Sequence, residues 1–208
     1  MTERRVRVKV CGVTRPEDAR LAVELGADAV GIIMAERSPR CVARDTAMAV
    51  RAAVDGLTAL VVLFADPAEA QVHDVVDWLR PDLIQFHGSE SPDYCAAFGR
   101  PYIKALSYRE ADRWHAYGGA RAIIIDSHAP GGAGGTGRSF DWKGFPSDSD
   151  RPLLLAGGLG PSNVAQAIAL ARPYGVDVSS GLERAPGIKD ERKMQEFFSE
   201  VRRAERGQ

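Results

Sequence analysis

Eight short runs of apolar, often β-branched residues recur along this chain of 208 residues, and stretches of helical character separate them. Many of the runs are apolar throughout, as in parallel strands that are buried on both faces. Strands that alternate with helices in this way predict a parallel sheet with helical crossovers. The eight predicted strands are Val6–Cys11, Ala29–Ile33, Ala59–Phe64, Leu83–Phe86, Tyr102–Ala105, Ala122–Ile125, Leu153–Ala156 and Val176–Ser179.

The segments between the runs carry apolar residues at helical spacing. Three stripes are clear: Val72, Val75, Val76 and Leu79; Val164, Ala167, Ile168 and Ala171; and Met194, Phe197, Phe198 and Val201. Thr14 and Asp66 each precede a proline and a glutamate three residues on, which predicts that their side chains cap the next helix. Ser91 offers the same cap before a proline. The segment from Glu110 to Tyr117 has no apolar stripe and is the weakest predicted helix.

The number of strand and helix units decides between two α/β architectures. Eight units in 208 residues fit a (β/α)8 barrel, the TIM barrel, whereas an open doubly wound sheet more often stops at about five or six strands. The length suits one domain, and no linker or low-complexity tract interrupts the alternation. We therefore predict a single-domain (β/α)8 barrel over residues 1–208.

Composition and charge exclude several kinds of partner. Lys and Arg number 27 against 28 Asp and Glu, so no field of one sign is present to hold nucleic acid or an anionic membrane. The chain has no apolar stretch of the roughly 18 to 20 residues that cross a bilayer, and its first residues lack the apolar segment that a signal peptide requires. Its three cysteines lack disulfide or zinc-site spacing. We expect a cytoplasmic protein that binds a small molecule, with no nucleic-acid or membrane partner.

In such a barrel the active site lies at the carboxyl ends of the strands, which makes Cys11 a candidate. Along the first run, Val8 and Val10 would face the helices, while Lys9 and Cys11 would face the interior. The thiol would then lie at the barrel mouth, where a positive surrounding lowers its pKa and makes it a usable base or nucleophile. Taken alone, a free cysteine is more often a small buried hydrophobe.

Asp126 ends the sixth run and is a candidate acid. A carboxyl group in partly apolar surroundings can keep its proton and donate it to a substrate, although a helix or turn cap is the alternative. An acid and a base that project into one barrel mouth are the equipment needed to move a proton between neighbouring carbons of a sugar phosphate.

Glycines follow the seventh and eighth runs, at the recurrent phosphate site of this architecture. Gly157 and Gly158 lead into a helix start, and Ser180 and Gly181 follow the last strand. Backbone N–H groups in such loops suit an anion, whereas the alternative is that the glycines only form tight turns. We predict that these four residues bind a phosphate group.

Three further polar residues follow or end strands. Arg40, on the loop after the second strand, would bind a carboxylate in a bidentate pair, although loop arginines are usually just solvated. His87 would orient a substrate or serve as a hydrogen-bonded structural residue. Asp177 and Lys9 point inward from strands that become neighbours when the barrel closes, so a structural ion pair is their simplest interpretation.

Several segments, in order and spacing, carry a resemblance that spans nearly the whole chain. They are Lys9-Val10-Cys11-Gly12-Val13-Thr14, Gly26-Ala27-Asp28-Ala29-Val30-Gly31, Ser38-Pro39-Arg40, Gln85-Phe86-His87-Gly88, Gly134-Gly135-Thr136-Gly137 with Phe140-Asp141-Trp142, Leu155-Ala156-Gly157-Gly158-Leu159 and Asp177-Val178-Ser179-Ser180-Gly181. In these segments the chain resembles phosphoribosylanthranilate isomerase, the isomerase of tryptophan biosynthesis.

The resemblance implies the barrel fold and an Amadori rearrangement of N-(5-phosphoribosyl)anthranilate to 1-(2-carboxyphenylamino)-1-deoxyribulose 5-phosphate, with no metal or cofactor. It implies that Asp126 protonates the furanose ring oxygen and that Cys11 then removes the C2 proton. Arg40 would hold the anthranilate carboxylate, the loops at Gly157-Gly158 and Ser180-Gly181 the phosphate, and His87 and Asp177 would contact the sugar. A monomer and a homodimer both remain open.

The chain departs from the family pattern on the side of the aryl group. Met34 and Cys41 stand where aromatic residues are common, and Glu36 precedes the Ser-Pro-Arg segment, which would loosen that pocket. The related histidine-pathway isomerase uses an aspartate in place of Cys11, which argues against that activity. A non-catalytic binding barrel is opposed by the pair of Cys11 and Asp126. A lyase or epimerase would need a metal cluster or a strand-end lysine that the sequence lacks.

Overall fold

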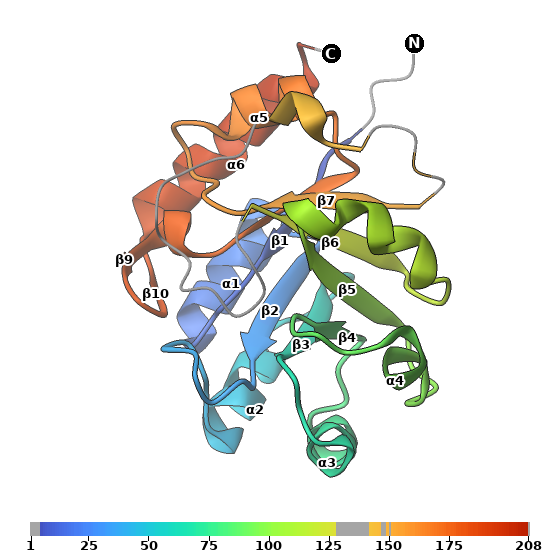
Figure 1. Ribbon diagram of the computed structural model, residues 1–208. Helices are drawn as coiled ribbons and strands as arrows, with labels where there is room; N and C mark the ends of the chain where they lie inside the picture. The colour runs from blue at the N-terminus through green and yellow to red at the C-terminus, as the bar shows by residue number, and fades with distance from the viewer. Residues whose placement is uncertain (1–4, 128–141, 147–148, 150, 208) are drawn as a thin grey trace.

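The computed structural model describes residues 5–127, 142–146, 149 and 151–207. Eight parallel strands close into a barrel in the order of the chain (Figure 1). They are β1 (Arg7–Val10), β2 (Ala29–Ile33), β3 (Ala59–Phe64), β4 (Leu83–Phe86), β5 (Tyr102–Ser107), β6 (Ala122–Asp126), β7 (Leu153–Ala156) and β8 (Gly175–Val178). The predicted (β/α)8 barrel is confirmed.

Every predicted strand is present, and the differences lie at strand ends. β5 continues two residues further than predicted, because Leu106 and Ser107 pair with the last two residues of β6. β8 begins at Gly175, where an added Cβ would come within 2.8 Å of the backbone of the neighbouring β1. Cys11 lies just past β1 instead of inside it, and its N–H donates to the carbonyl of Val178. The exact strand ends are therefore set by hydrogen bonding to the neighbouring strands of the barrel, which the local pattern of apolar residues does not reveal.

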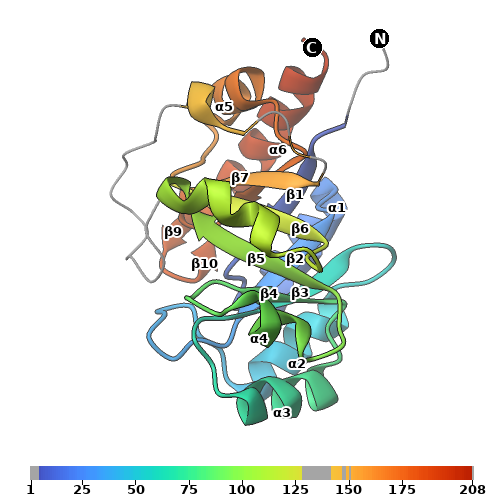
Figure 2. The same ribbon diagram turned by 45° about the vertical axis from the view of Figure 1, so that its right-hand side comes forward.

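Helices cover the outside of the barrel (Figure 2). They are α1 (Pro16–Leu25), α2 (Arg44–Ala53), α3 (Glu69–Leu79), α4 (Pro92–Ala96), α5 (Val164–Ala171) and α6 (Glu191–Glu205), with the 3₁₀ helices η1 (Tyr108–Ala116), η2 (Trp142–Gly144) and η3 (Ser180–Leu182). α6 packs against both α5 and α1, which closes the outer ring where the two ends of the barrel sequence meet. Among the described helices, none is long and apolar enough to cross a membrane.

The three predicted apolar stripes are buried in full, on α3, α5 and α6. The segment without a stripe, Glu110 to Tyr117, lies largely within η1. A 3₁₀ helix has three residues per turn, and Ala111 and Trp114, three residues apart, are its buried residues. A search for a period of 3.6 residues therefore finds nothing there.

One of the three predicted caps is confirmed and two are wrong. The Ser91 hydroxyl accepts a hydrogen bond from the N–H of Tyr94 at the start of α4. α1 instead begins after Arg15, and the Thr14 hydroxyl donates to the carbonyl of Gly187. α3 begins three residues after Asp66, whose carboxylate accepts from the N–H of Ser89. Both side chains bind a distant loop, which competes with the local cap.

The interior contains two apolar clusters, one between the strands and the helices and one inside the barrel, and charged side chains such as Lys9 are buried above the second. Val8 and Val10 belong to the buried cluster between the strands and the helices, whereas Lys9 is buried inside the barrel, as predicted. Below the mouth, apolar side chains such as Ile124 and Leu154 fill the barrel. The chain also forms a small antiparallel hairpin that was not predicted, β9 (Glu183–Ala185) and β10 (Ile188–Lys189), between η3 and α6.

Candidate active site

The parallel barrel gathers the predicted site residues at the carboxyl ends of its strands. Cys11 follows β1, His87 follows β4, Asp126 ends β6 and Asp177 lies in β8. β7 and β8 separate β6 from β1, so the predicted acid and base enter the mouth from different sides of it. This is the end of a (β/α)8 barrel at which active sites are built.

Cys11 is a buried thiol with two cations near it. Its side chain is 4% exposed and packs with Ile33 and Leu63. Burial raises the pKa of the Cys11 thiol, and the charges of Lys9, which also hydrogen-bonds the thiol, and Lys189 oppose this rise without cancelling it. The predicted lowering of the Cys11 pKa is therefore wrong for the free enzyme, because burial and the negative charge of Asp177 outweigh the two cations.

Lys9 and Asp177 form the ion pair predicted for them. Lys9 Nζ donates to Asp177 Oδ1 at 2.8 Å, and the two side chains are 2% and 8% exposed. Burial disfavours the ammonium, but Asp177 and Cys11 together raise the pKa of Lys9, so the lysine stays charged. A contact between Asp177 and a sugar stays a prediction.

His87 lies between two polar side chains of the mouth. Gln85, which is fully buried on β4, donates to His87 Nδ1 at 3.1 Å, while His87 Nε2 lies 3.7 Å from Asp126 Oδ2. Burial lowers the pKa of His87, and the charge of Asp126 only partly offsets this. With Nδ1 accepting from Gln85, the neutral imidazole carries its proton on Nε2, toward Asp126. Gln85 was named in a family segment but was not predicted as a site residue, because it lies inside an apolar run.

The loop after β7 favours glycine at two positions. Gly157 and Gly158 have φ angles of 91° and 65°. A Cβ on Gly157 would also lie 2.7 Å from Asp126 Oδ1 and collide with the Ser127 side chain. Asn163 holds this loop by donating to the carbonyl of Gly158 at 2.9 Å. The turn-forming role of these glycines is thus confirmed, and phosphate binding stays a prediction.

The loop after β8 packs against the loop after β7. A Cβ on Gly181 would collide with the carbonyl oxygen of Leu159. In the described part of the chain, the backbone N–H groups of Gly157, Gly158 and Gly181 have no acceptor. Donors left open on two adjoining loops are what an anion site requires.

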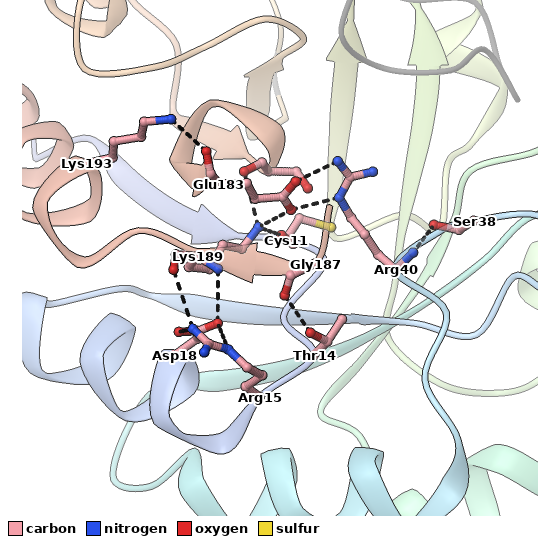
Figure 3. Close-up of polar contacts among 11 residues, drawn as sticks. Cys11, Thr14, Arg15, Asp18, Ser38, Arg40, Glu183, Gly187, Lys189 and Lys193 are labelled. Carbon is pink, nitrogen blue, oxygen red and sulfur yellow. Dashed lines mark hydrogen bonds and ion pairs between the residues drawn. The ribbon is translucent and has the colours of Figure 1, made fainter. Parts of the chain in front are cut away.

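Arg40 is not a solvated loop arginine. Its Nε and Nη2 donate to the two carboxylate oxygens of Glu183, each at 2.7 Å, and Lys189 Nζ donates to the same carboxylate at 2.9 Å (Figure 3). Glu183 and Lys189 were not predicted as site residues. The only sequence signal for them is the turn dipeptide Pro186-Gly187, which indicates a hairpin but not its ion pairs.

Comparison with known proteins decides the family. The family model for N-(5'-phosphoribosyl)anthranilate isomerase matches residues 8–200. The chain belongs to this family. The resemblance inferred from sequence is confirmed, and with it the isomerase activity and the place in tryptophan biosynthesis.

Individual members of the phosphoribosylanthranilate isomerase family match along nearly their whole length. The N-(5'-phosphoribosyl)anthranilate isomerase of Stenotrophomonas maltophilia is 47% identical over 207 residues, covering 97% of this chain and 95% of the relative. The crystal structure of the Thermotoga maritima enzyme aligns with a TM-score of 0.86 at 34% identity, covering 95% of this chain and 98% of that one. A complex of the isomerase with reduced 1-(o-carboxyphenylamino)-1-deoxyribulose 5-phosphate aligns with a TM-score of 0.80 at 32% identity, covering 95% and 98%.

The departures from the phosphoribosylanthranilate isomerase pattern lie around the loop after β2. Met34 is partly buried against the outer core between strands and helices. Cys41 is an exposed residue whose backbone bridges to Ile33; partial desolvation of its thiol together with the charge of Glu36 raises the pKa of that thiol. A looser aryl pocket stays a prediction.

One family segment cannot be placed. The glycine-rich run Gly134-Gly135-Thr136-Gly137 and the pair Phe140-Asp141 lie outside the described residues, and Trp142 after them is buried. Among the described residues, no group of three or more His, Cys, Asp or Glu side chains could hold a metal ion.

Proposed function

We propose that this chain converts N-(5-phosphoribosyl)anthranilate to 1-(2-carboxyphenylamino)-1-deoxyribulose 5-phosphate with Asp126 as general acid and Cys11 as general base. The observation that carries the assignment is the arrival of both side chains at one barrel mouth, from β6 and β1, beside the two glycine loops. Acid and base catalysis by positioned side chains is typically worth about 10² to 10⁴ in rate.

The first step opens the sugar ring. Asp126 donates its proton to the furanose oxygen, the bond from C1 to that oxygen breaks, and the nitrogen lone pair forms a cationic Schiff base at C1. The transfer leaves Asp126 as a carboxylate. The Nε2–H of His87, 3.7 Å from Asp126 Oδ2 in the free enzyme, stabilises the negative charge as the site tightens around substrate.

The second step moves the proton from C2. The Cys11 thiolate takes this proton, the electrons of the C2–H bond form the C1–C2 double bond of an enolamine, and the π electrons of the Schiff base return to its nitrogen. Loss of the proton from the 2-hydroxyl and protonation at C1 then give the ketone. Lys9 and Lys189 favour the thiolate form that this step uses.

The remaining predicted residues bind the two ends of the substrate. The N–H groups at Gly157, Gly158 and the Ser180-Gly181 turn hold the phosphate, and Arg40 holds the anthranilate carboxylate. His87 and Asp177 contact the sugar between them. The two anionic ends of the substrate thus fix its reacting carbons between Asp126 and Cys11.

The catalytic roles are tested by Cys11→Ala and Asp126→Ala. Each variant is expected to lose roughly a hundredfold or more in turnover, whereas affinity for the reduced product analogue, measured by calorimetry, stays within a few-fold. Cys95→Ala, which removes a buried thiol at α4 away from the mouth, is the matched control and keeps its turnover. A loss below about tenfold in either variant contradicts that residue's role.

The rival interpretation, a non-catalytic binding barrel, has its own test. The intact gene is expected to restore growth of a tryptophan auxotroph that lacks this step, and the Cys11→Ala gene is not. No growth with the intact gene, in a host that the Stenotrophomonas maltophilia relative rescues, would favour the binding barrel.

We further propose that residues 1–208 form one catalytic domain that acts in the cytoplasm as a monomer or a homodimer. The reaction as written needs only a positioned acid and base, and no metal or cofactor enters it. All three cysteines are free thiols, as is usual in a reducing compartment.

A further inference from the structure

The guanidinium of Arg40 is held along one edge only. Nε and Nη2 engage Glu183, and none of the described residues accepts a hydrogen bond from Nη1. A planar guanidinium offers two edges at which a carboxylate can bind in a bidentate pair. The edge formed by Nη1 and Nη2 is therefore open for a second carboxylate, in a direction that Glu183 determines.

Glu183 is itself fixed by Lys189, its partner across the hairpin. Lys189 is fully buried, and its Nζ donates to Glu183 Oε1 at 2.9 Å and to the carbonyls of Cys11 and Ser179 at 2.7 and 3.1 Å (Figure 3). These bonds use all three ammonium hydrogens. The carboxylate that holds Arg40 is thus tied through Lys189 to Cys11, which follows β1, and to Ser179, which follows β8.

The hairpin is also joined to α1 and α6. The N–H of Lys189 donates to Asp18 on α1 at 3.1 Å, and Arg15 holds Asp18 in a bidentate pair at 2.6 and 2.9 Å. Lys193 on α6 donates to the carbonyl of Glu183 at 2.6 Å. Two helices and two barrel strands therefore fix the position of one carboxylate.

The charges of this cluster do not cancel. Arg40 and Lys189 contribute two positive charges around the single negative charge of Glu183. Despite burial, Arg40 and Lys189 lower the pKa of Glu183, so it remains ionised. A buried site with one positive charge in excess favours an added anionic group, and the open edge of Arg40 offers hydrogen-bond donors to such a group.

We propose that Glu183, braced by Lys189, is a positioning residue that sets the plane of Arg40 so that its open edge meets the substrate carboxylate. The inference rests on the proposed function, in which Arg40 binds that carboxylate. Glu183 acts through Arg40 and touches no reacting atom. Its loss frees the Arg40 side chain to adopt other rotamers, which weakens binding of the carboxylate and leaves the proton transfers in place.

The experiment compares two substrates, N-(5-phosphoribosyl)anthranilate and N-(5-phosphoribosyl)aniline, which lacks the carboxylate. Glu183→Gln is expected to raise KM for the first on the order of tenfold with little change in kcat, and to leave KM for the second within about twofold. Arg40→Ala is expected to show the same selectivity with an equal or larger effect. The double variant is expected to be no worse than Arg40→Ala, because the two residues act as one unit.

Two further variants separate positioning from general stability. Glu183→Asp keeps the charge but is one methylene too short, so it is expected to behave like Glu183→Gln and serves if that variant does not fold. Glu90→Gln is the matched control, because Glu90 forms a buried 2.7 Å pair with Lys104 of β5 and does not contact Arg40. It is expected to lower the thermal midpoint and to leave the KM ratio of the two substrates unchanged.

The outcomes distinguish the positioning role of Glu183 from the proposed function on which it rests. If Arg40→Ala affects both substrates equally, the carboxylate contact of Arg40 is wrong. If Arg40→Ala is selective but neither Glu183 variant is, the positioning role is wrong and the proposed function stands. A lower KM in Glu183→Gln would mean that Glu183 competes with the substrate for Arg40, which overturns the inference as well.

Discussion

At the scale of single residues, Cys11 combines two roles that sequence reasoning set against each other. It is buried like a core cysteine, yet it lies beside the ammonium groups of Lys9 and Lys189. Because burial outweighs both cations, the pKa of the thiol stays above its ordinary value, and the thiolate fraction at neutral pH is small. A reaction that needs the thiolate should therefore speed up as the pH rises.

Replacing Lys9 tests this balance. Lys9→Met removes the cation that lowers the pKa of Cys11 most, and it leaves the charge of Asp177, which raises that pKa, without its partner. We expect the rising limb of kcat/KM to move to higher pH, and alkylation of Cys11 by iodoacetamide, in a Cys41→Ser background, to move with it. Lys104→Met is the control, since Lys104 is equally buried but pairs with Glu90. An unmoved limb in Lys9→Met would contradict the role of this lysine.

The sequence predicted those site residues whose position follows from strand geometry. Alternation along β1 and β8 was enough to place Lys9 opposite Asp177, and the ends of apolar runs located Cys11 and Asp126. Glu183 could not be found in this way, because its partner Arg40 is 143 positions away in the chain and sits on an irregular loop. No local pattern encodes such a pair.

At the scale of elements, the predictions succeeded where an element is long enough to repeat its apolar pattern. Strands and helix stripes repeat apolar residues at a fixed period, so the sequence carries their signal several times over. The hairpin β9–β10 has strands of three and two residues, too short for any period. The caps predicted at Thr14 and Asp66 failed because each side chain bonds a distant loop of the same end of the barrel.

The hairpin turn depends on Gly187. Its φ of 78° favours glycine, and an added Cβ would lie 3.0 Å from Cγ2 of Thr14. Gly26 has a φ of 97° but open space around it, so Gly26→Ala measures the backbone cost alone, about 1 to 2 kcal/mol. We expect Gly187→Ala to lose more unfolding free energy in urea than Gly26→Ala. Adding Thr14→Ser to the Gly187→Ala variant removes the methyl group that the new Cβ contacts, so the double variant is expected to recover part of the difference. Equal losses in Gly187→Ala and Gly26→Ala would mean that the hairpin turn can accommodate a Cβ atom at position 187.

At the scale of the whole molecule, the fold concentrates buried charge at its catalytic end. The pairs Lys9–Asp177, Glu90–Lys104 and Glu183–Lys189 all lie near the carboxyl ends of strands, while the outer core is apolar. Buried pairs of this kind are costly to desolvate and seldom improve on apolar packing. Their concentration beneath one mouth is what a molecule needs when it must hold charged groups in fixed directions for a charged substrate.

This arrangement makes stability depend on pH through His87. Burial lowers its pKa below the ordinary value of 6.5, so as the pH falls through 6.5 the unfolded chain binds a proton there that the folded chain does not. Unfolding free energy must then decrease from about pH 6.5 down to the folded pKa. We expect His87→Gln to flatten this part of the curve in urea unfolding from pH 7.5 to 4, and to keep the steeper loss at lower pH that the lowered pKa of Glu183 contributes. His73→Gln, at an exposed site on α3, should leave the whole curve unchanged, and an identical slope near pH 6 in both variants would contradict the assignment to His87.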